Sequence, residues 1–286
     1  MNKLILFFVY ISFHFVYSQE SITGKILEAE TLKPLAYVNI GIANKAVGTV
    51  SDTHGNFKLQ LNEKVVSKDT IVFSHIGYAP RFIPISVLSN QNVTVKLEPL
   101  ETRLQEVVVK YKKPKTKKMG RKSKGFGLMH QNFYSFHEKD VDDRLSKEIG
   151  VRVPVKKDCR VQALNFNITT NDFKSLRFRI NFYQIKKGLP GELLNTRDII
   201  FEIEDGHLGW FKVDLTSFDI LLEKDLKEVV VSIQWLESEK ATPKSKYFSI
   251  STKVASTKSC FFREKTMDKW RVMKSKPSFY LDAECK

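Results

Sequence analysis

The chain contains 286 residues, of which 42% are hydrophobic and 12% aromatic. This length favours two domains over one, and this apolar content excludes a chain that is disordered throughout. The formal net charge of +15 would alone suggest a nucleic-acid-binding protein, but eight of the positive charges lie between Lys112 and Lys124, so the charge marks one segment rather than a basic folded surface.

The first residues have the pattern of an export signal. Lys3 precedes an apolar run over residues 4–17, which is too short for an ordinary membrane span. Val16 and Ser18 have the side-chain sizes that signal peptidase accepts before a cleavage site. We predict a signal peptide over residues 1–18 and no transmembrane span in the mature chain, with an uncleaved N-terminal anchor as the alternative. Export argues against nucleic acid as a partner.

Residues 19–110 are predicted to form a small β-sandwich, because short runs of alternating apolar and polar residues recur at close intervals. Gly55 is expected to provide the positive φ of a tight turn. The surrounding segment lacks the ligand spacing of a calcium loop, so we expect Asp52 and Asn56 to hydrogen-bond nearby backbone amides. The predicted strands span residues 22–27, 36–42, 47–52, 57–61, 70–74, 81–85 and 93–97.

Four segments of this domain resemble a known family. They are residues 23–26, 34–40, 48–57 and 74–78, reading TGKI, PLAYVNI, GTVSDTHGNF and SHIGY. In this order they resemble the carboxypeptidase-regulatory-like domain, a transthyretin-like Greek-key sandwich found in exported Bacteroidetes proteins. The resemblance implies a non-catalytic domain. Receptors that depend on TonB often continue with a segment similar to residues 104–109, but no receptor plug or barrel pattern follows here, so we do not expect transport.

Residues 111–125 are predicted to form a basic, flexible linker that separates two domains. Repulsion among like charges keeps such a segment extended and solvated. Contact with an anionic envelope surface is a second use for this charge. The basic residues concerned are Lys112, Lys113, Lys115, Lys117, Lys118, Arg121, Lys122 and Lys124.

Residues 126–286 are predicted to form a jelly-roll-like β-sandwich with an N-terminal adapter segment over residues 126–150. In residues 176–183 the alternation is clear, because one face is apolar and Arg179 and Asn181 lie on the other. The fold class is therefore all-β, with two sandwiches joined by the basic linker. The predicted strands of the second domain span residues 151–155, 161–168, 176–183, 199–203, 209–215, 229–235, 248–251 and 279–281.

Several segments of the second domain resemble the jelly-roll modules of bacterial adhesins and carbohydrate-binding appendages. They are residues 178–183, 188–191 and 193–194, followed by Trp210 with residues 214–215. Such modules bind sugars through exposed aromatic side chains, so the resemblance implies ligand-binding roles for Trp210, Trp235 and Trp270. A core position is the competing interpretation for Trp210 and Trp235, which lie within alternating strands. The polar surroundings of Trp270 predict that it is the most exposed of the three.

The three cysteines all lie in the second domain, and export would permit a disulfide. We favour a bridge between Cys159 and Cys285, because it would tie the two ends of this domain together. No nucleophile elbow, HExxH motif or glycine-rich phosphate loop is present. The aromatic neighbours of His130, His137 and Glu138 favour a structural role over metal binding. We therefore predict no enzyme activity, no metal and no cofactor.

These observations favour an exported, non-catalytic binding protein of the cell envelope, located in the periplasm or associated with the outer membrane. Its C-terminal sandwich would bind a glycan or an envelope protein. The alternative is a structural or assembly partner of a TonB-dependent outer-membrane complex, with no small ligand.

Overall fold

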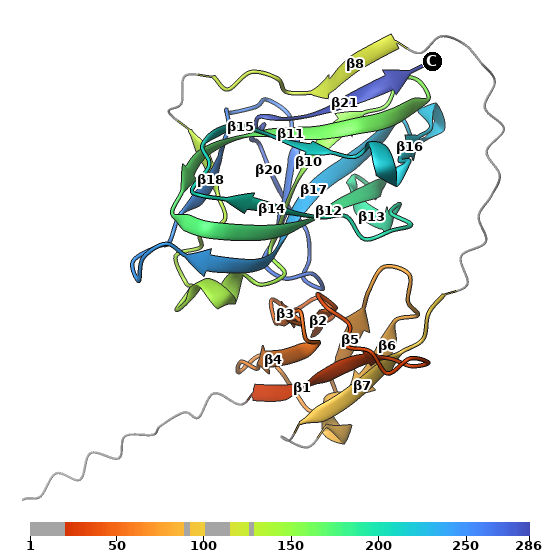
Figure 1. Cartoon of the computed structure of the whole chain (residues 1–286), viewed down its shortest axis with the longest axis vertical. Helices are drawn as coiled ribbons and strands as arrows, with labels where there is room; N and C mark the ends of the chain where they lie inside the picture. The colour runs from red at the N-terminus through yellow and green to blue at the C-terminus, as the bar shows by residue number, and fades with distance from the viewer. Residues whose placement is uncertain (1–20, 89–91, 101–114, 126–128) are drawn as a thin grey trace, which may run out of the picture.

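The computed structural model describes residues 21–88, 92–100, 115–125 and 129–286, and the predicted signal peptide lies outside these ranges. Figure 1 shows two bodies built from strands, a smaller N-terminal one and a larger C-terminal one. The predicted fold class, all-β with two sandwiches, is confirmed. No helix in the described ranges is long and apolar enough to cross a membrane.

The N-terminal sandwich consists of a three-stranded and a four-stranded sheet. Strand β4 shows why the two layers pack, because Phe57 and Leu59 are buried whereas the residues between and beside them are exposed. The three-stranded sheet has the order β4 (Asn56–Gln60), β1 (Ser21–Glu28) and β7 (Val93–Leu97). The four-stranded sheet has the order β3 (Gly48–Val50), β2 (Asn39–Ile42), β5 (Thr70–Ser74) and β6 (Arg81–Pro84).

The tight turn predicted at Gly55 is present between β3 and β4. Gly55 has a φ of +77°, and a Cβ atom there would lie 2.5 Å from the carbonyl oxygen of Ile26. The backbone N–H groups of His54 and Asn56 each donate to Oδ1 of Asp52 at 2.8 Å. The Asp52 carboxylate therefore stabilises the turn, as predicted. The prediction that the Asn56 side chain bonds to a backbone amide is wrong, because its Nδ2 donates to Oδ2 of Asp52 at 3.1 Å.

The C-terminal sandwich consists of two seven-stranded sheets around one apolar core, which includes Phe166, Phe178 and Trp235. The first sheet has the order β13 (Leu189–Leu193), β12 (Phe173–Lys186), β17 (Glu228–Lys240), β10 (Glu148–Pro154), β19 (Cys260–Arg263) and β20 (Arg271–Met273), with β14 (Ile200–Glu204) also beside β12. The second sheet has the order β8 (Lys115–Gly120), β21 (Phe279–Cys285), β11 (Cys159–Asn171), β18 (Phe248–Ser251) and β9 (His130–Asn132), with β15 (Gly209–Asp214) and β16 (Leu221–Leu222) also beside β11.

Each of the eight strands predicted for this domain corresponds to a strand of the structure, but β8, β9, β13, β16, β19 and β20 were not predicted. These strands are short, with two to six residues each. Strand β13 contains Pro190 and Gly191, which are residues typical of turns. Pro190 is compatible with a strand here because β13 lies at the edge of its sheet.

The linker prediction is wrong for residues 115–120, which form β8. This strand pairs antiparallel with β21, from Lys115 opposite Cys285 to Gly120 opposite Tyr280. Backbone pairing does not require apolar side chains, and Met119 alone among the residues of β8 is buried. The composition of the segment therefore did not reveal its backbone structure.

The basic residues of the predicted linker differ in their surroundings. Arg121 is only 7% exposed and donates from Nη1 to the carbonyl oxygen of Lys276 at 2.8 Å, so it is not available to an outside partner. Lys112 and Lys113 lie outside the described residues. The exposed residues of the set are Lys115, Lys117, Lys118, Lys122 and Lys124.

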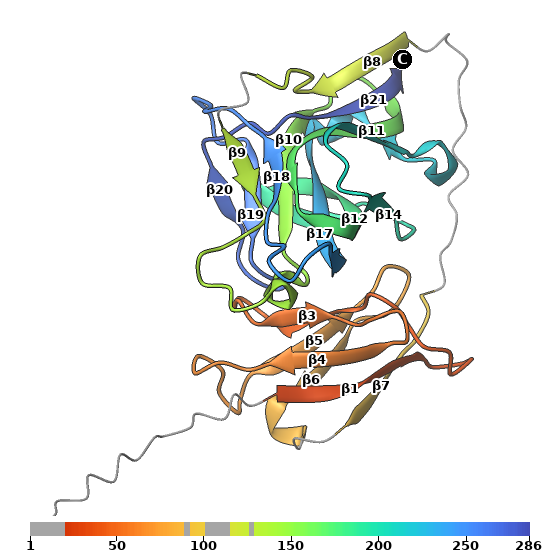
Figure 2. The ribbon, with the colours of Figure 1, turned by 60° about the vertical axis from the view of Figure 1, so that its left-hand side comes forward.

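The two sandwiches contact each other directly, and Figure 2 shows the side of the N-terminal sandwich that carries β3 facing the C-terminal one. Oδ1 of Asn39 accepts hydrogen bonds from Nε2 of Gln234 at 2.6 Å and from Oγ1 of Thr266 at 3.1 Å. The hydroxyl of Tyr37 donates to Oε2 of Glu237 at 2.7 Å. The sequence predicted two domains held apart by a spacer, and the structure instead places them in contact.

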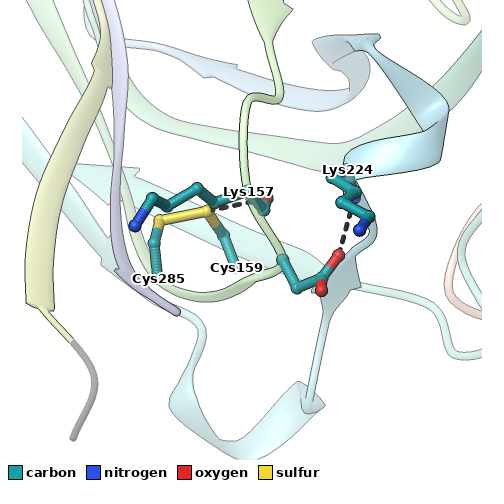
Figure 3. Close-up of a disulfide and its surroundings, with 5 residues drawn as sticks. Lys157, Cys159, Lys224 and Cys285 are labelled. Atoms are coloured by element: carbon teal, nitrogen blue, oxygen red, sulfur yellow. Dashed lines mark hydrogen bonds between the residues drawn. A yellow bond between two sulfur atoms is a disulfide. The ribbon is translucent and has the colours of Figure 1, made fainter. Parts of the chain in front are cut away.

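A disulfide joins the ends of two neighbouring strands, as Figure 3 shows. Cys159 begins β11 and Cys285 ends β21, and the two residues lie directly opposite each other in the sheet. Their Sγ atoms are 2.08 Å apart. This is the pairing favoured by the sequence. Cys260 in β19 is a buried free thiol.

Candidate functional site

Trp235 is excluded as a ligand-binding residue. Its side chain is 0% exposed, and it lies in the core of the C-terminal sandwich against Phe133, Phe173 and Phe178, with ring centroids 5.3–5.6 Å apart. Strand β17 alternates as predicted, but the face that carries Trp235 points between the two sheets. The prediction of a ligand role for this residue is therefore wrong, because no sugar ring has access to it.

Trp270 is half-buried rather than the most exposed of the three tryptophans. The guanidinium of Arg263 lies 4.3 Å from the Trp270 ring, and the Tyr183 ring packs edge-on against it at 5.7 Å. Arg263 also donates to Oε2 of the fully buried Glu148. Trp270 therefore covers a buried ion pair, a role that its polar sequence neighbours did not indicate.

Trp210 is the tryptophan that the structure leaves most open, with 37% of its surface exposed. It lies on β15, whose alternate residues Phe211 and Val213 pack against the core. Its ring packs edge-on against Tyr280 of β21, with centroids 5.2 Å apart and an interplanar angle of 66°. Two aromatic side chains from strands far apart in sequence thus meet on the outer face of the second sheet.

Neighbouring strands place polar side chains on the same outer face. Asn167 lies opposite Trp210, and Asn165 lies opposite both Lys212 and Tyr280. On the edge strand, Lys118 lies opposite Asp282. We call this surface the outer platform, and it consists of Lys118, Asn165, Asn167, Trp210, Lys212, Tyr280 and Asp282.

The platform residues form a sparse network of polar contacts. Nδ2 of Asn165 donates to Oδ2 of Asp282 at 2.9 Å. Nζ of Lys118 lies 3.8 Å from Oδ1 of Asp282 and 4.8 Å from the centroid of the Tyr280 ring. The side-chain amide of Asn167 makes no hydrogen bond with any residue that the structure describes. Asn165, Asn167 and Tyr280 are only 5%, 4% and 9% exposed, so the part of the platform open to a ligand consists of the Trp210 ring and the charged side chains around it.

A cleft of about 1060 Å³ lies between the two sandwiches. Glu138 in its wall accepts hydrogen bonds from Arg144 and from the fully buried Lys147. Lys265 donates to the backbone carbonyls of Asp143 and Leu145 at 2.6 and 2.9 Å, and burial lowers its pKa to about 8. These charges are matched within the protein, so they serve the packing of this region.

The local set of possible metal ligands, His130, His137 and Glu138, is divided between other contacts. Nδ1 of His130 lies 2.7 Å from Oγ1 of Thr169, and Glu138 is engaged in the ion pairs described above. In the described ranges of the chain, no group of three or more His, Cys, Asp or Glu side chains is positioned to hold a metal ion.

Comparison with known families identifies the first sandwich. Residues 22–109 match the CarboxypepD_reg-like domain family. The N-terminal sandwich belongs to this family. The match ends with residues 104–109, the segment that resembles the one following this domain in receptors, and these residues lie outside the described ranges. The CarboxypepD_reg-like domain accounts for less than half of the chain, so its name describes the N-terminal sandwich alone.

No curated protein sequence matches the chain. Among solved structures, the cysteine protease and lectin-like domains of Cwp84, a surface-layer-associated protein of Clostridium difficile, are 8% identical over 50% of this chain, with a TM-score of 0.37. This chain spans only 33% of that protein. A Bacteroides uniformis protein to which carbohydrate binding is ascribed is 11% identical, covers 81% of this chain and 95% of its own, and has a TM-score of 0.23. These similarities are too low to assign a ligand.

Proposed function

We propose that this protein is an exported, non-catalytic binding protein that holds a glycan on the outer platform of its C-terminal sandwich. The observation that carries the proposal is the exposed ring of Trp210, which packs against Tyr280 on the outer face of the second sheet. An aromatic face can pack against the C–H face of a sugar ring, and the ammonium and carboxylate groups around Trp210 can hydrogen-bond to its hydroxyl groups.

The non-catalytic part of the proposal rests on how the carboxylates of this domain are used. Glu148 is fully buried against Arg263, and Glu202 forms an ion pair with Arg177. On the outer face of the second sheet, the carboxylate of Asp282 already accepts a hydrogen bond from Asn165, and that of Asp214 accepts hydrogen bonds from Thr216. General acid and base catalysis on a glycosidic bond commonly uses two carboxyl groups. The family of the first sandwich and the apolar run of residues 4–17 support export to the envelope.

A glycan array probed with the mature protein tests this proposal. We expect binding to at least one glycan class, and we expect Trp210→Ala to weaken it about tenfold through loss of ring stacking. Phe136→Ala is the matched control, because Phe136 is 86% exposed and lies outside the platform. Absence of glycan binding, or equal effects of the two substitutions, would contradict the assignment.

A structural or assembly role is the second candidate, and one observation favours it. Strand β6 is the edge strand of the four-stranded sheet, and Phe82 on it is 62% exposed. An open edge with an exposed aromatic residue can receive a strand from a partner protein. If this role holds, an envelope protein will co-purify with the full mature chain, and Phe82→Lys will abolish its capture while Phe136→Ala will not.

A further inference from the structure

We infer that one side of the C-terminal sandwich docks on the anionic headgroups of a lipid bilayer. This inference goes beyond the proposed glycan-binding function and rests on other residues. Residues 121–125, 251–259 and 274–278 form this side, and together they contain seven basic residues and no acidic one. We call it the basic side, and its exposed lysines are Lys122, Lys124, Lys253, Lys258, Lys274 and Lys276.

Two of these segments connect the two sheets. Residues 252–259 lead from β18 in the second sheet to β19 in the first, and residues 274–278 lead back from β20 to β21. The two connections run antiparallel, and the backbone N–H of Lys276 donates to the carbonyl oxygen of Lys253 at 2.9 Å. Figure 2 shows this side of the sandwich, where β9, β19 and β20 lie. Lysines that are far apart in the sequence are therefore neighbours here.

The segment that follows β8 joins the same side. Nη1 of the buried Arg121 donates to the carbonyl oxygen of Lys276 at 2.8 Å, so this side chain holds the segment against the connection after β20. Oγ of Ser251 donates to the carbonyl oxygen of Lys124. The ammonium groups of Lys122 and Lys124 stay exposed. Part of the predicted linker thus adds its charge to a folded surface.

The alternation of side chains directs the lysines outward. Along the chain that enters β21, Pro277 and Phe279 are buried, whereas Lys274 and Lys276 at the alternate positions are exposed. Lys253 stands opposite Lys276 in the paired connections, so both side chains lie on the same face. The basic side therefore presents several ammonium groups in one direction.

The protein does not neutralise this charge. The six ammonium groups form no ion pair or hydrogen bond with any residue in the described ranges. Elsewhere on this sandwich exposed cations have acidic partners, as when Lys174 pairs with Glu239 and Arg177 with Glu202. Asp282, further along β21, is engaged by Asn165. The positive charge of the basic side is therefore available to an anionic partner.

The composition of the basic side favours a bilayer over other polyanions. The three segments contain no aromatic residue, so neither a sugar ring nor a nucleic-acid base has a side chain on which to stack. Their lysines come from three parts of the chain and form a patch, which can meet many headgroups of one membrane plane at once. A cluster of four to eight basic residues is typical of binding to anionic lipids, and each one strengthens it by about fivefold.

Co-sedimentation with vesicles tests the inference on the mature chain, residues 19–286, because the apolar run of residues 4–17 would itself bind lipid. One set of vesicles contains equal parts of phosphatidylglycerol and phosphatidylcholine, and the other contains phosphatidylcholine alone. Polygalacturonate supplies an anionic polysaccharide at the same concentration of negative charge. We expect the anionic vesicles to bind about tenfold more tightly than either alternative, and we expect salt to weaken this binding.

Substitutions assign the binding to the basic side. Lys274→Gln combined with Lys276→Gln should weaken binding to anionic vesicles about twentyfold. Lys25→Gln combined with Lys96→Gln is the matched control, because it removes the same charge from exposed strand positions of the N-terminal sandwich and should change nothing. Circular dichroism checks that each variant is folded.

Three outcomes would overturn the inference. They are equal binding to the two sets of vesicles, binding to polygalacturonate as tight as to the anionic vesicles, and equal losses in the two double variants. Trp210→Ala should leave vesicle binding unchanged, because Trp210 lies outside the basic side. An empty glycan array would therefore overturn the proposed function and leave this inference standing.

Discussion

Arg179 donates two hydrogen bonds to the carboxylate of Asp198, from Nε to Oδ1 at 2.5 Å and from Nη2 to Oδ2 at 2.7 Å. Its Nη2 also donates to the carbonyl oxygen of Tyr37 at 3.0 Å, and Nε2 of His75 lies 3.4 Å from Asp198. Tyr37 and His75 belong to the N-terminal sandwich. The Arg179–Asp198 ion pair of the C-terminal sandwich therefore contacts both the Tyr37 backbone and the His75 side chain of the N-terminal sandwich. These contacts hold the two sandwiches against each other.

Replacing Arg179 by Met should lower the free energy of unfolding by about 3 kcal/mol, because it leaves the mostly buried carboxylate of Asp198 without its cation. Urea denaturation followed by tryptophan fluorescence measures this loss. Arg160→Met is the control, since Arg160 and Asp219 form a pair that is 42% and 59% exposed, and its removal should cost less than about 1 kcal/mol. Similar losses in the two variants would show that the Arg179 pair is not important for docking.

The same pair predicts how stability depends on pH. Burial tends to raise the pKa of Asp198, but the charges and hydrogen bonds of Arg179 and His75 outweigh it and hold that pKa well below its usual range. The folded chain therefore binds a proton at Asp198 less readily than the unfolded chain does. The stabilisation is complete above the unfolded pKa of about 3.9 and is lost as the pH falls below it.

Asp198→Asn isolates this contribution. At pH 7 the variant should be less stable than the wild type, and the difference in unfolding free energy should shrink as the pH is lowered from about 5 towards about 3. Urea denaturation at a series of pH values gives both curves. A difference that stays constant over this range would show that Asp198 does not titrate as the ion pair requires.

Periodicity predicted which face of a strand is apolar, but not what covers the other face. The alternation in β12 placed Phe178 on one side and Arg179 and Asn181 on the other, and the structure agrees. However, Arg179 is 1% exposed and Asn181 3%, although this face points away from the core of their own sandwich. Their partners come from distant positions such as Tyr37 and Glu148, and no local pattern identifies a partner so far along the chain.

The candidate site shows the same limit. Trp210 and Trp235 both lie in alternating strands, and their burial depends on which face of which sheet each strand presents to the core. Trp210 was named as a candidate from the sequence, whereas Asn167 and Tyr280 were not, because they meet it only through the order of β15, β11 and β21. For β8, the edge strand beside β21, the sequence showed only a basic composition, which we interpreted as a linker.

Local turn chemistry was predictable, and Gly55 allows a test with an internal control. Gly55 and Gly77 both have positive φ, at +77° and +84°, but only at Gly55 would an added Cβ meet backbone, the Ile26 carbonyl at 2.5 Å. We expect Gly77→Ala to cost about 1 kcal/mol for conformation alone, and Gly55→Ala about 3 kcal/mol because the turn must also move. Thermal unfolding of the two variants measures the difference, and equal costs would indicate that the turn relaxes freely.

The disulfide should be a major source of stability for the C-terminal sandwich. Cys159 and Cys285 are 126 residues apart, so their bond restricts a long loop of the unfolded chain, which corresponds to about 4–5 kcal/mol by loop entropy and typically about 2–4 kcal/mol in practice. Cys159→Ala combined with Cys285→Ala should lower the unfolding free energy by this amount, and reduction of the wild type should do the same.

Cys260 should not exchange into the bridge, because it is fully buried and burial raises its thiol pKa to about 12. Native protein treated with iodoacetamide should therefore remain unlabelled. Rapid labelling, or a double variant as stable as the wild type, would contradict this account of the bridge.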